Sequence, residues 1–448
     1  MVAWNTTSPD TTTQQPTPTL GKRVAIVAGA RTPLAKMGTA LRDVHVTDLA
    51  KRVFQETLYR ANWRADRLDE VILGNVVMPA DAANPARVAA LWAGVPRNVP
   101  GLSLQRNCAS GMEAIAEAVL RIRGGQGEAI LAGGAESMSN IPLLLPGEAM
   151  EPVSQLARAR GAWKQATAAA RLRPRHFHPV AALELGLTDP TCGMIMGKTA
   201  EVLVQEFGIS RGEQDEFALQ SHQKATAAWA SGRFEDETVA VYAPANGRFN
   251  PVTTDIGPRA NQSLEALAKL KPMFDRRDGS VTVGNSCQVT DGACAVLVMD
   301  ADRAAAEGLP VLGYVRAYAY TGLDPARMGL GPVFAIDRLL RQTGLALSDV
   351  PLLEINEAFA GQVLACVKAM TSARFACEHL GRKEAIGTLD PARLNVNGGA
   401  IALGHPVGAT GARIVLTLLL EMRRRGVERG IAALCVGGGQ GAAMLLER

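Results

Sequence analysis

The segment Asn397-Gly-Gly-Ala-Ile-Ala-Leu-Gly-His-Pro-Val-Gly408 indicates the architecture of this protein. Its glycines predict a tight loop, and the residues from about Thr410 to Arg424 are expected to form a helix. The apolar run Ile431-Ala-Ala-Leu-Cys435 is typical of a buried strand, and it ends in the glycine-rich turn Val436-Gly-Gly-Gly-Gln-Gly441. A loop, a helix and a buried strand in this order predict an α/β unit.

The same order of elements occurs earlier in the chain. We expect strands at 23–28, 70–74 and 129–133, and helices at 48–62 and from Asn107-Cys-Ala-Ser-Gly111 to the glycine pair at 124–125. The second half is expected to repeat the plan, with strands at 311–315 and 352–355 and a helix at 333–343. This alternation predicts mainly parallel sheets covered by helices, and the two similar halves predict a duplicated unit with pseudo-twofold symmetry.

The composition excludes several classes of protein. The chain has 448 residues, 47 of them basic and 43 acidic, and 47% are apolar, as in globular proteins of two or three domains. A formal net charge of +4 is too small to indicate nucleic acid as a partner. No apolar run approaches the roughly 20 residues that a membrane-spanning helix needs.

The seven cysteines are odd in number and scattered, which argues against a disulfide framework, and no C-x-x-C pair indicates zinc. We therefore expect no metal and a reducing, cytoplasmic location. Residues 1–21 are rich in Thr, Pro and Gln and lack an apolar signal core. We predict that they form a disordered tail.

A segment of different character, roughly 141–280, separates the two halves. Its first part, 142–180, carries six basic residues (Arg158, Arg160, Lys164, Arg171, Arg173 and Arg175) against two acidic ones, Glu148 and Glu151. A solvated helical excursion and a basic surface for docking or for covering a substrate both explain this pattern.

Cys108 is predicted to lie where a loop meets the N-terminus of a helix. The helix dipole and the free N–H groups at such a place stabilise a thiolate. Ala109, Ser110 and Gly111 are small and leave room for a substrate carbonyl. A lone cysteine before a helix is more often a packed residue, so the position alone does not establish a nucleophile.

Three further positions have a chemical interpretation beside a structural one. His405, held in a glycine loop, can take a proton from a thiol, although most loop histidines are inert. Cys435 ends a buried strand, where open α/β sheets place ligands, and the N–H of Gly437 can then face an oxyanion. Asn356 follows a strand and can hold a water or a carbonyl oxygen, or can simply cap the loop.

Together these motifs resemble the thiolase family, and they occur in the family's order. The resemblance covers about residues 23–448. The main matches are Asn107-Cys-Ala-Ser-Gly111, Asn356-Glu-Ala-Phe-Ala360, Gly404-His-Pro-Val-Gly-Ala-Thr-Gly411 and Cys435-Val-Gly-Gly-Gly-Gln-Gly441. Shorter matches are Arg31-Thr-Pro33, Gly133-Gly-Ala-Glu-Ser-Met138, Met196-Gly197 with Thr199-Ala-Glu201, and Gly284-Asn285 with Asp291-Gly292.

The resemblance implies a five-layered αβαβα fold, built from two duplicated mixed-sheet halves and an inserted loop domain. The N-terminal half would be 22–140, with 281–307 returning to it, and the C-terminal half would be 308–448. The loop domain, 141–280, would bind CoA or form a partner surface.

The resemblance also implies a reaction, the reversible cleavage of 3-oxoacyl-CoA by CoA into acyl-CoA and acetyl-CoA with ping-pong kinetics. Cys108 would carry the acyl group, and His405 would take the thiol proton and return it to the leaving CoA. Cys435 would exchange the proton on the acetyl α-carbon. Asn356, with a water, and His405 would form one oxyanion site, and the N–H groups of Cys108 and Gly437 the other.

The substrate side follows from the same resemblance. Met196, Cys287 and Phe359 would contact the substrate, with CoA and acyl-CoA as substrates and no cofactor. A homodimer or a dimer of dimers is implied.

Some residues depart from the family's usual patterns. Ile195 stands where small-chain biosynthetic thiolases carry His, and Cys287 stands where a Ser commonly contacts CoA. Both favour the degradative, β-oxidation branch. The middle segment, Leu330-Gly-Pro332 and Gly361-Gln-Val-Leu-Ala365 resemble the β chain of the fatty-acid trifunctional enzyme. This implies an α subunit with hydratase and dehydrogenase activity as a candidate partner, although those β chains usually carry His in place of Asn356.

Other assignments share this fold. A biosynthetic acetyl-CoA acetyltransferase, which forms acetoacetyl-CoA, needs the same residues and stays open, because the motifs set neither chain length nor direction. A non-catalytic scaffold would lack Cys108, His405 or Cys435, yet all three are present. A ketoacyl-carrier-protein synthase typically has no second catalytic cysteine, so Cys435 argues against it.

Overall fold

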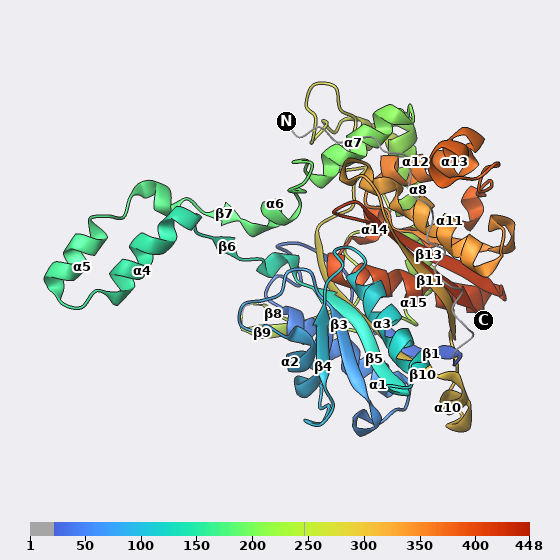
Figure 1. Ribbon diagram of the computed structural model, residues 1–448, viewed down its shortest axis with the longest axis horizontal. Coiled ribbons are helices and arrows are strands. Elements are labelled where there is room, and N and C mark those ends of the chain that lie inside the picture. The colour runs from blue at the N-terminus through green and yellow to red at the C-terminus, as the bar shows by residue number, and fades with distance from the viewer. Residues whose placement is uncertain (1–21, 246) are drawn as a thin grey trace.

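A computed structural model describes residues 22–245 and 247–448 (Figure 1), and the tail predicted at 1–21 lies outside the described residues. The N-terminal half contains β1 Val24–Arg31, β2 Ala35–Lys36, α1 Val46–Arg60, β3 Glu70–Gly74, α2 Pro85–Trp92, β4 Gly101–Leu104, α3 Ser110–Arg123, β5 Ala129–Glu136, β10 Thr290–Asp300 and α10 Ala301–Ala306. The C-terminal half contains β11 Gly313–Gly322, α11 Gly331–Thr343, β12 Leu352–Ile355, α12 Ala360–Thr371, α13 Ala373–Leu380, α14 Ala400–Leu403, α15 Val407–Arg425, β13 Arg429–Val436 and β14 Gln440–Glu447.

The strands of the two halves follow the same order. The N-terminal half runs β1-β10-β5-β3-β4 and the C-terminal half runs β11-β14-β13-β12. A parallel bridge between Leu353 and Leu394 stands beside β12 where the first half has β4. Even the irregularities correspond, because the register shifts between Ile26 and Ala28 in β1 and between Val315 and Ala317 in β11. The predicted duplication is confirmed down to this bulge.

A short antiparallel pairing of β1 with β11 joins the strands of the two halves into one ten-stranded sheet. Its N-terminal and C-terminal parts, called the two sheets below, form the expected αβαβα stack with three helical layers. α1 and α2 cover one face of the N-terminal sheet, α3 and α15 lie between the two sheets, and α11 covers the far face of the C-terminal sheet with α12 packed beside it. Strand alternation explains the layers. In β1, Ala25 and Val27 belong to the outer cluster, whereas Val24 and Ile26 belong to the central one.

The prediction of mainly parallel sheets was wrong. Parallel pairs occur at β3–β4, β3–β5 and β12–β13, but β10 and β14 run antiparallel to their neighbours on both sides. Both strands are missing from the predicted elements. β14 follows β13 after a turn of three glycines, Gly437 to Gly439, and so short a connection allows only an antiparallel return. The sheet is therefore mixed, which confirms the mixed-sheet halves that the resemblance implied.

The segment between the halves has two parts. An arm projects from the body on the two-stranded stem of β6 Leu143–Leu144 and β7 Val180–Ala181, and it carries α4 Met150–Arg158, α5 Ala162–Ala169 and, next to the body, α6 Ala182–Gly186 (Figure 1). The six basic residues noted above are all exposed on it. The second part returns to the body with α7 Met196–Glu206, α8 Arg211–Ala230, the hairpin of β8 Val241–Ala245 and β9 Arg248–Val252, and α9 Leu264–Ala268; α7 and α8 pack on α12.

In the described part of the chain, we find no helix with the length and apolar character that crossing a bilayer requires.

Glycines let the two central helices meet backbone to backbone. A Cβ on Gly111 of α3 would lie 2.8 Å from the backbone nitrogen of Ala412, and one on Gly411 of α15 would lie 2.4 Å from that of Met112. Any larger side chain would separate the helices. Both contacts lie near the N-termini of these helices, so they bring the two loops that precede the helices together.

We predict that Gly411→Ala lowers the free energy of unfolding by about 1–3 kcal/mol, because the added methyl overlaps the backbone of α3. Urea denaturation measures the change. Gly186→Ala is the matched control, since nothing lies within 4 Å of the Cβ it adds, and it should keep the wild-type midpoint. A wild-type midpoint for Gly411→Ala would contradict the close approach.

Candidate active site

Cys108 lies in a tight loop between β4 and α3. Asn107 has a left-handed backbone, with φ of 43°, and its Nδ2 donates to the carbonyl oxygen of Gly437 at 2.8 Å. Ser110 closes the loop, since its Oγ accepts from the N–H of Arg106 and donates to the carbonyl of Asn107. The loop is thus tied both to its own helix and to the glycine turn after β13.

The sulfur of Cys108 faces backbone donors. Burial raises the pKa of this thiol, whereas hydrogen bonds from the N–H groups of Gly437 and of Cys108 itself lower it. Two N–H groups aimed at one sulfur also suit the oxygen of a carbonyl that the sulfur attacks. Gly437 further borders Met196, whose Sδ would lie 3.4 Å from a Cβ at that glycine.

His405 is held in one orientation and one tautomer. The backbone N–H of His405 donates to the carbonyl of Gln288 at 3.0 Å, and the ring nitrogen Nδ1 lies 2.7 Å from Oγ1 of Thr410. Thr410 donates its own proton to the carbonyl of Pro406 at 3.0 Å. The threonine oxygen must therefore accept from His405, so Nδ1 carries the proton and Nε2 keeps its lone pair.

The imidazole is neutral at ordinary pH. Burial, followed by the positive charge of Arg413, lowers the pKa of His405 to about 3. Its Nε2 lies 3.4 Å from Nδ2 of Asn356. The Oδ1 of Asn356 is buried and has no hydrogen-bond partner among the described residues. An unpartnered buried acceptor suits a bound water or a substrate donor.

Buried carboxylates anchor the loops. Glu357 accepts hydrogen bonds from Oγ of Ser221 at 2.6 Å, Nδ2 of Asn395 at 2.9 Å and the N–H of Ile401 at 3.2 Å. It thereby joins the loop after β12 to the loop that leads to His405. Burial raises the pKa of Glu357.

Glu136, the last residue of β5, is a second buried carboxylate that anchors loops of the site. It accepts from the N–H groups of Val76, Val77 and Gly408 and from Nδ2 of Asn75. Burial raises its pKa to about 7, against the effect of these donors.

Two further thiols, those of Cys435 and Cys287, are near enough to Cys108 to interact with it electrostatically. Burial and then Cys108 raise the pKa of Cys435 well above the ordinary value, and the same two causes raise that of Cys287 to about 12. Cys287 is placed by its N–H, which donates to the carbonyl of Ala358 at 2.9 Å. Phe359 pairs with Ser286 through a β-bridge, and its ring meets Phe274 edge-on at 6.0 Å.

The predicted residues therefore converge. Loops from both halves carry Cys108, His405, Asn356 and Gly437, and the end of β13 carries Cys435, to one region at the N-termini of α3 and α15, with Met196, Cys287 and Phe359 beside them. The sequence reasoning assigned no role to Asn107, Thr410, Glu136, Glu357 and Arg413. All except Arg413 lie inside motifs quoted above, which was the available signal. The partners of Asn107 and Glu136 are distant in sequence, whereas those of Thr410 lie within five residues.

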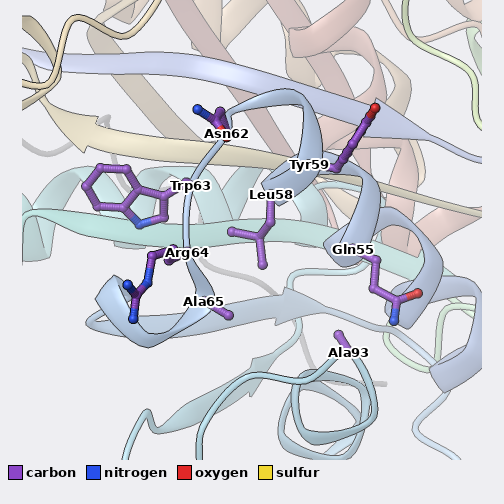
Figure 2. A pocket seen from close by; sticks show the side chains of 8 residues that line it. All are labelled: Gln55, Leu58, Tyr59, Asn62, Trp63, Arg64, Ala65 and Ala93. Carbon is purple, nitrogen blue, oxygen red and sulfur yellow. The ribbon is translucent and has the colours of Figure 1, made fainter.

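Two negative observations complete the description. In residues 22–245 and 247–448, no three His, Cys, Asp or Glu side chains gather so that they could hold a metal ion. The open hollow in Figure 2 lies elsewhere, between α1 and the end of α2, and its lining includes Leu58, Trp63 and Ala93 but no residue of the site.

A half-buried thiol with amide donors, a neutral imidazole and a second thiol beside it fits an enzyme that transfers acyl groups through cysteine. Family models agree. The description "Thiolase, N-terminal domain" matches residues 24–302, and "Thiolase, C-terminal domain" matches residues 309–448. The chain belongs to the thiolase family and is an acyltransferase.

Individual relatives carry two different names. A 3-ketoacyl-CoA thiolase of Salmonella heidelberg (strain SL476) is 40% identical over 95% of this chain and 97% of the relative. An acetyl-CoA acetyltransferase of Pseudomonas aeruginosa is 44% identical over 95% of this chain and 99% of the relative. The crystal structure of the Bacillus anthracis acetyl-CoA acetyltransferase has a TM-score of 0.84 at 40% identity, covering 95% and 99%. The crystal structure of human mitochondrial 3-ketoacyl-CoA thiolase in complex with CoA has a TM-score of 0.81 at 35% sequence identity, and the match covers 95% of this chain and 98% of that one.

Thr410→Val should slow transfer of an acyl group to Cys108 by roughly 10²-fold, because the Nδ1–H of His405 loses its acceptor and the ring is released from its orientation. A single-turnover measurement of acyl-enzyme formation tests this. Thr410→Ser keeps the hydroxyl and should stay within a few-fold of wild type. Equal losses in both variants would show that the hydroxyl is not the relevant contact.

Proposed function

We propose that this thiolase cleaves 3-oxoacyl-CoA with free CoA in fatty-acid β-oxidation. The observation that carries the proposal is the hydrogen bond from Nδ2 of Asn107 to the carbonyl of Gly437 at 2.8 Å, which joins the Cys108 loop to the glycine turn after Cys435; the N–H groups of Gly437 and Cys108 lower the pKa of the Cys108 thiol. Names of relatives support two pathways, and the acetyltransferases among them favour synthesis of acetoacetyl-CoA as the second candidate.

In the first half-reaction, the thiol of Cys108 gives its proton to Nε2 of His405 while the sulfur attacks the 3-oxo carbonyl. The negative oxygen then lies at the N–H groups of Cys108 and Gly437. Collapse breaks the bond between the α-carbon and that carbonyl, and the released carbanion of acetyl-CoA takes a proton from Cys435. Acyl-Cys108 remains, and acetyl-CoA leaves.

In the second half-reaction, the thiol of free CoA attacks acyl-Cys108. The proton of the CoA thiol passes to the Cys435 thiolate, acyl-CoA leaves, and the Cys108 sulfur takes back the proton that His405 held. Both thiols are then protonated and His405 is neutral, as the next turnover requires. Stabilisation of the enolate oxygen is assigned to His405 and to a water held by Asn356, whose Oδ1 is unpartnered among the described residues. Each such donor is worth on the order of 3 kcal/mol.

The thiols of Cys108 and Cys435 suit these two roles. Burial raises the pKa of Cys108 and of Cys435, so neither is a thiolate at rest, and each must lose its proton within the reaction. For Cys108 the acceptor is the neutral His405, and for Cys435 it is the carbanion formed in cleavage. We assign substrate contacts to Met196, Cys287 and Phe359, and no cofactor is needed for these steps.

The wider setting is also proposed. We expect a homodimer or a dimer of dimers, and an α subunit with hydratase and dehydrogenase activity as a candidate partner. The seven cysteines are all free thiols, which supports a reducing compartment, the cytoplasm.

Cys108→Ala should abolish the acyl-enzyme that acetyl-CoA forms, whereas Cys435→Ala should still be acylated but lose exchange of the acetyl α-protons with solvent. Mass spectrometry of the intact protein measures the first, and deuterium incorporation into acetyl-CoA the second. If both folded variants lost acylation equally, the division of roles would be wrong.

The choice between the two pathways is tested by chain length. Thiolysis should proceed with 3-oxoacyl-CoA of ten or sixteen carbons at a kcat/KM at least equal to that for acetoacetyl-CoA. Side-by-side spectrophotometric assays of the wild-type enzyme measure this. Activity confined to the four-carbon substrate would favour the biosynthetic candidate.

A further inference from the structure

One face of α15 carries a buried polar stripe. Thr410, Arg413, Thr417 and Glu421 follow each other at helical spacing, and all four are buried between the sheets. Three of them have hydrogen-bond partners: Thr410 holds His405, Thr417 donates to Glu237 at 2.9 Å, and Glu421 accepts from Asn397 at 3.1 Å.

Arg413 differs from the rest of the stripe. Only 2% of it is exposed, and its Nε and Nη1 are buried with no hydrogen-bond partner among the described residues. Burying a guanidinium without partners is costly, and burial is accordingly the first cause that lowers the pKa of Arg413. A cation kept under these conditions acts through its charge and not through hydrogen bonds.

The charged neighbours of Arg413 come from several elements. Among these charges, Glu354 on β12 raises the pKa of Arg413 most, followed by Glu237. The positive charge of Arg31 on β1 lowers this pKa, and Glu357 after β12 raises it least. Glu237 is already engaged, because it accepts from Nε of Arg31 at 2.6 Å and from Thr417. Glu354 is therefore the main counter-charge. Lys224 of α8 also acts on Glu354 and Glu357.

Glu354 stands in the layer that contains the site. Along β12, Leu352 belongs to the central cluster between the sheets, whereas Leu353 and Ile355 belong to the outer one. Strand alternation puts Glu354 on the side of Leu352, toward α15. Burial raises the pKa of Glu354 to about 8, so it is mostly uncharged at neutral pH.

We propose that Arg413 is a positioning residue of the thiolase reaction, a fixed positive charge behind His405 that keeps a second proton off the imidazole, with Glu354 as its titratable counter-charge. The inference deepens the proposed function and rests on it. Arg413 lies one helical turn beyond Thr410, which holds Nδ1–H of His405, and its charge acts on His405 directly.

The charges of Arg413 and Glu354 determine how acylation of Cys108 should depend on pH. Below pH 8, Glu354 is protonated and neutral, so the charge of Arg413 is not offset by it and disfavours the imidazolium. A protonated His405 cannot accept the proton of Cys108. Removal of the guanidinium should therefore raise the pKa of His405 and move the acid limb of Cys108 acylation to higher pH, by about one pH unit or more for a like charge at close range.

The experiment is a single-turnover pH profile of the whole protein. Enzyme at pH 7 is jumped to values between pH 3.5 and 9 and mixed with acetyl-CoA, and acetyl-Cys108 is quantified by mass spectrometry after acid quench within tens of milliseconds. Profiles normalised at pH 7 should show the limb shifted upward for Arg413→Met and near wild type for Arg413→Lys, which restores the charge. Superimposed wild-type and Arg413→Met profiles would overturn the proposal.

Further variants separate charge from structure. Glu354→Gln should superimpose on wild type throughout the acid limb, because Glu354 is already neutral at those pH values; a shifted acid limb would show that Glu354 is ionised there and offsets Arg413, which would overturn the proposed unneutralised charge. Arg123→Met is the control for loss of a half-buried arginine with an unpartnered Nε, far along α3, and its profile should not move.

If Arg413→Met does not fold, the double variant Arg413→Met/Glu354→Gln removes the cation together with its counter-charge and should show the same upward shift. An unshifted limb in the folded double variant would overturn the proposal. Failure of wild-type Cys108 to acquire acetyl at any pH would refute the proposed function instead, so the two outcomes are distinguishable.

Discussion

The contact between the N-terminal turns of α3 and α15 is the constraint on which the site depends. Glycines at 111 and 411 bring the two backbones together, and Gly134 at the end of β5 makes room for the carbonyl oxygen of Gly408, which would lie 1.9 Å from a Cβ there. Each helix begins just after a catalytic loop, so the contact determines the separation of Cys108 and His405. It also directs two positive helix ends at one place, which favours the negative charge that thioester chemistry develops.

Buried polar groups then orient the loops of Cys108, His405 and Asn356, which the helices bring together. Asn107 ties the loop of Cys108 to Gly437, Glu136 ties the loop of His405 to the strand ends of the first half, and Glu357 ties it to the loop of Asn356. Each of these groups is satisfied by partners from another segment, so loss of one would leave buried atoms unpaired. The acidic and basic groups of the central layer, with Arg413 among them, set the protonation of the imidazole that these loops present.

Pattern reasoning succeeded where a segment carries its own signal. The strands at 70–74 and 352–355 have the predicted bounds, and the helices at 46–60 and 407–425 lie within a few residues of the prediction. It failed for β10 and β14, whose antiparallel pairing depends on partners on both sides. The same limit applied to the site: the thiols and the histidine stand out in the sequence, whereas Arg413 and Glu354 read as ordinary members of a helix and a strand.

The sequence by itself determined the family, the duplicated α/β plan and the residue types that perform the chemistry, because glycine loops, a cysteine before a helix and a histidine between glycines are local features. Only the tertiary structure decided which N–H groups face the sulfur of Cys108, which nitrogen of His405 carries the proton, and how the mixed sheets are paired. Some of these properties arise from contacts between segments far apart in the chain, such as the hydrogen bond from Asn107 to Gly437, 330 residues away. Others, such as the contact of His405 with Thr410, join residues close in sequence, but their geometry exists only once the loop and the helix are folded.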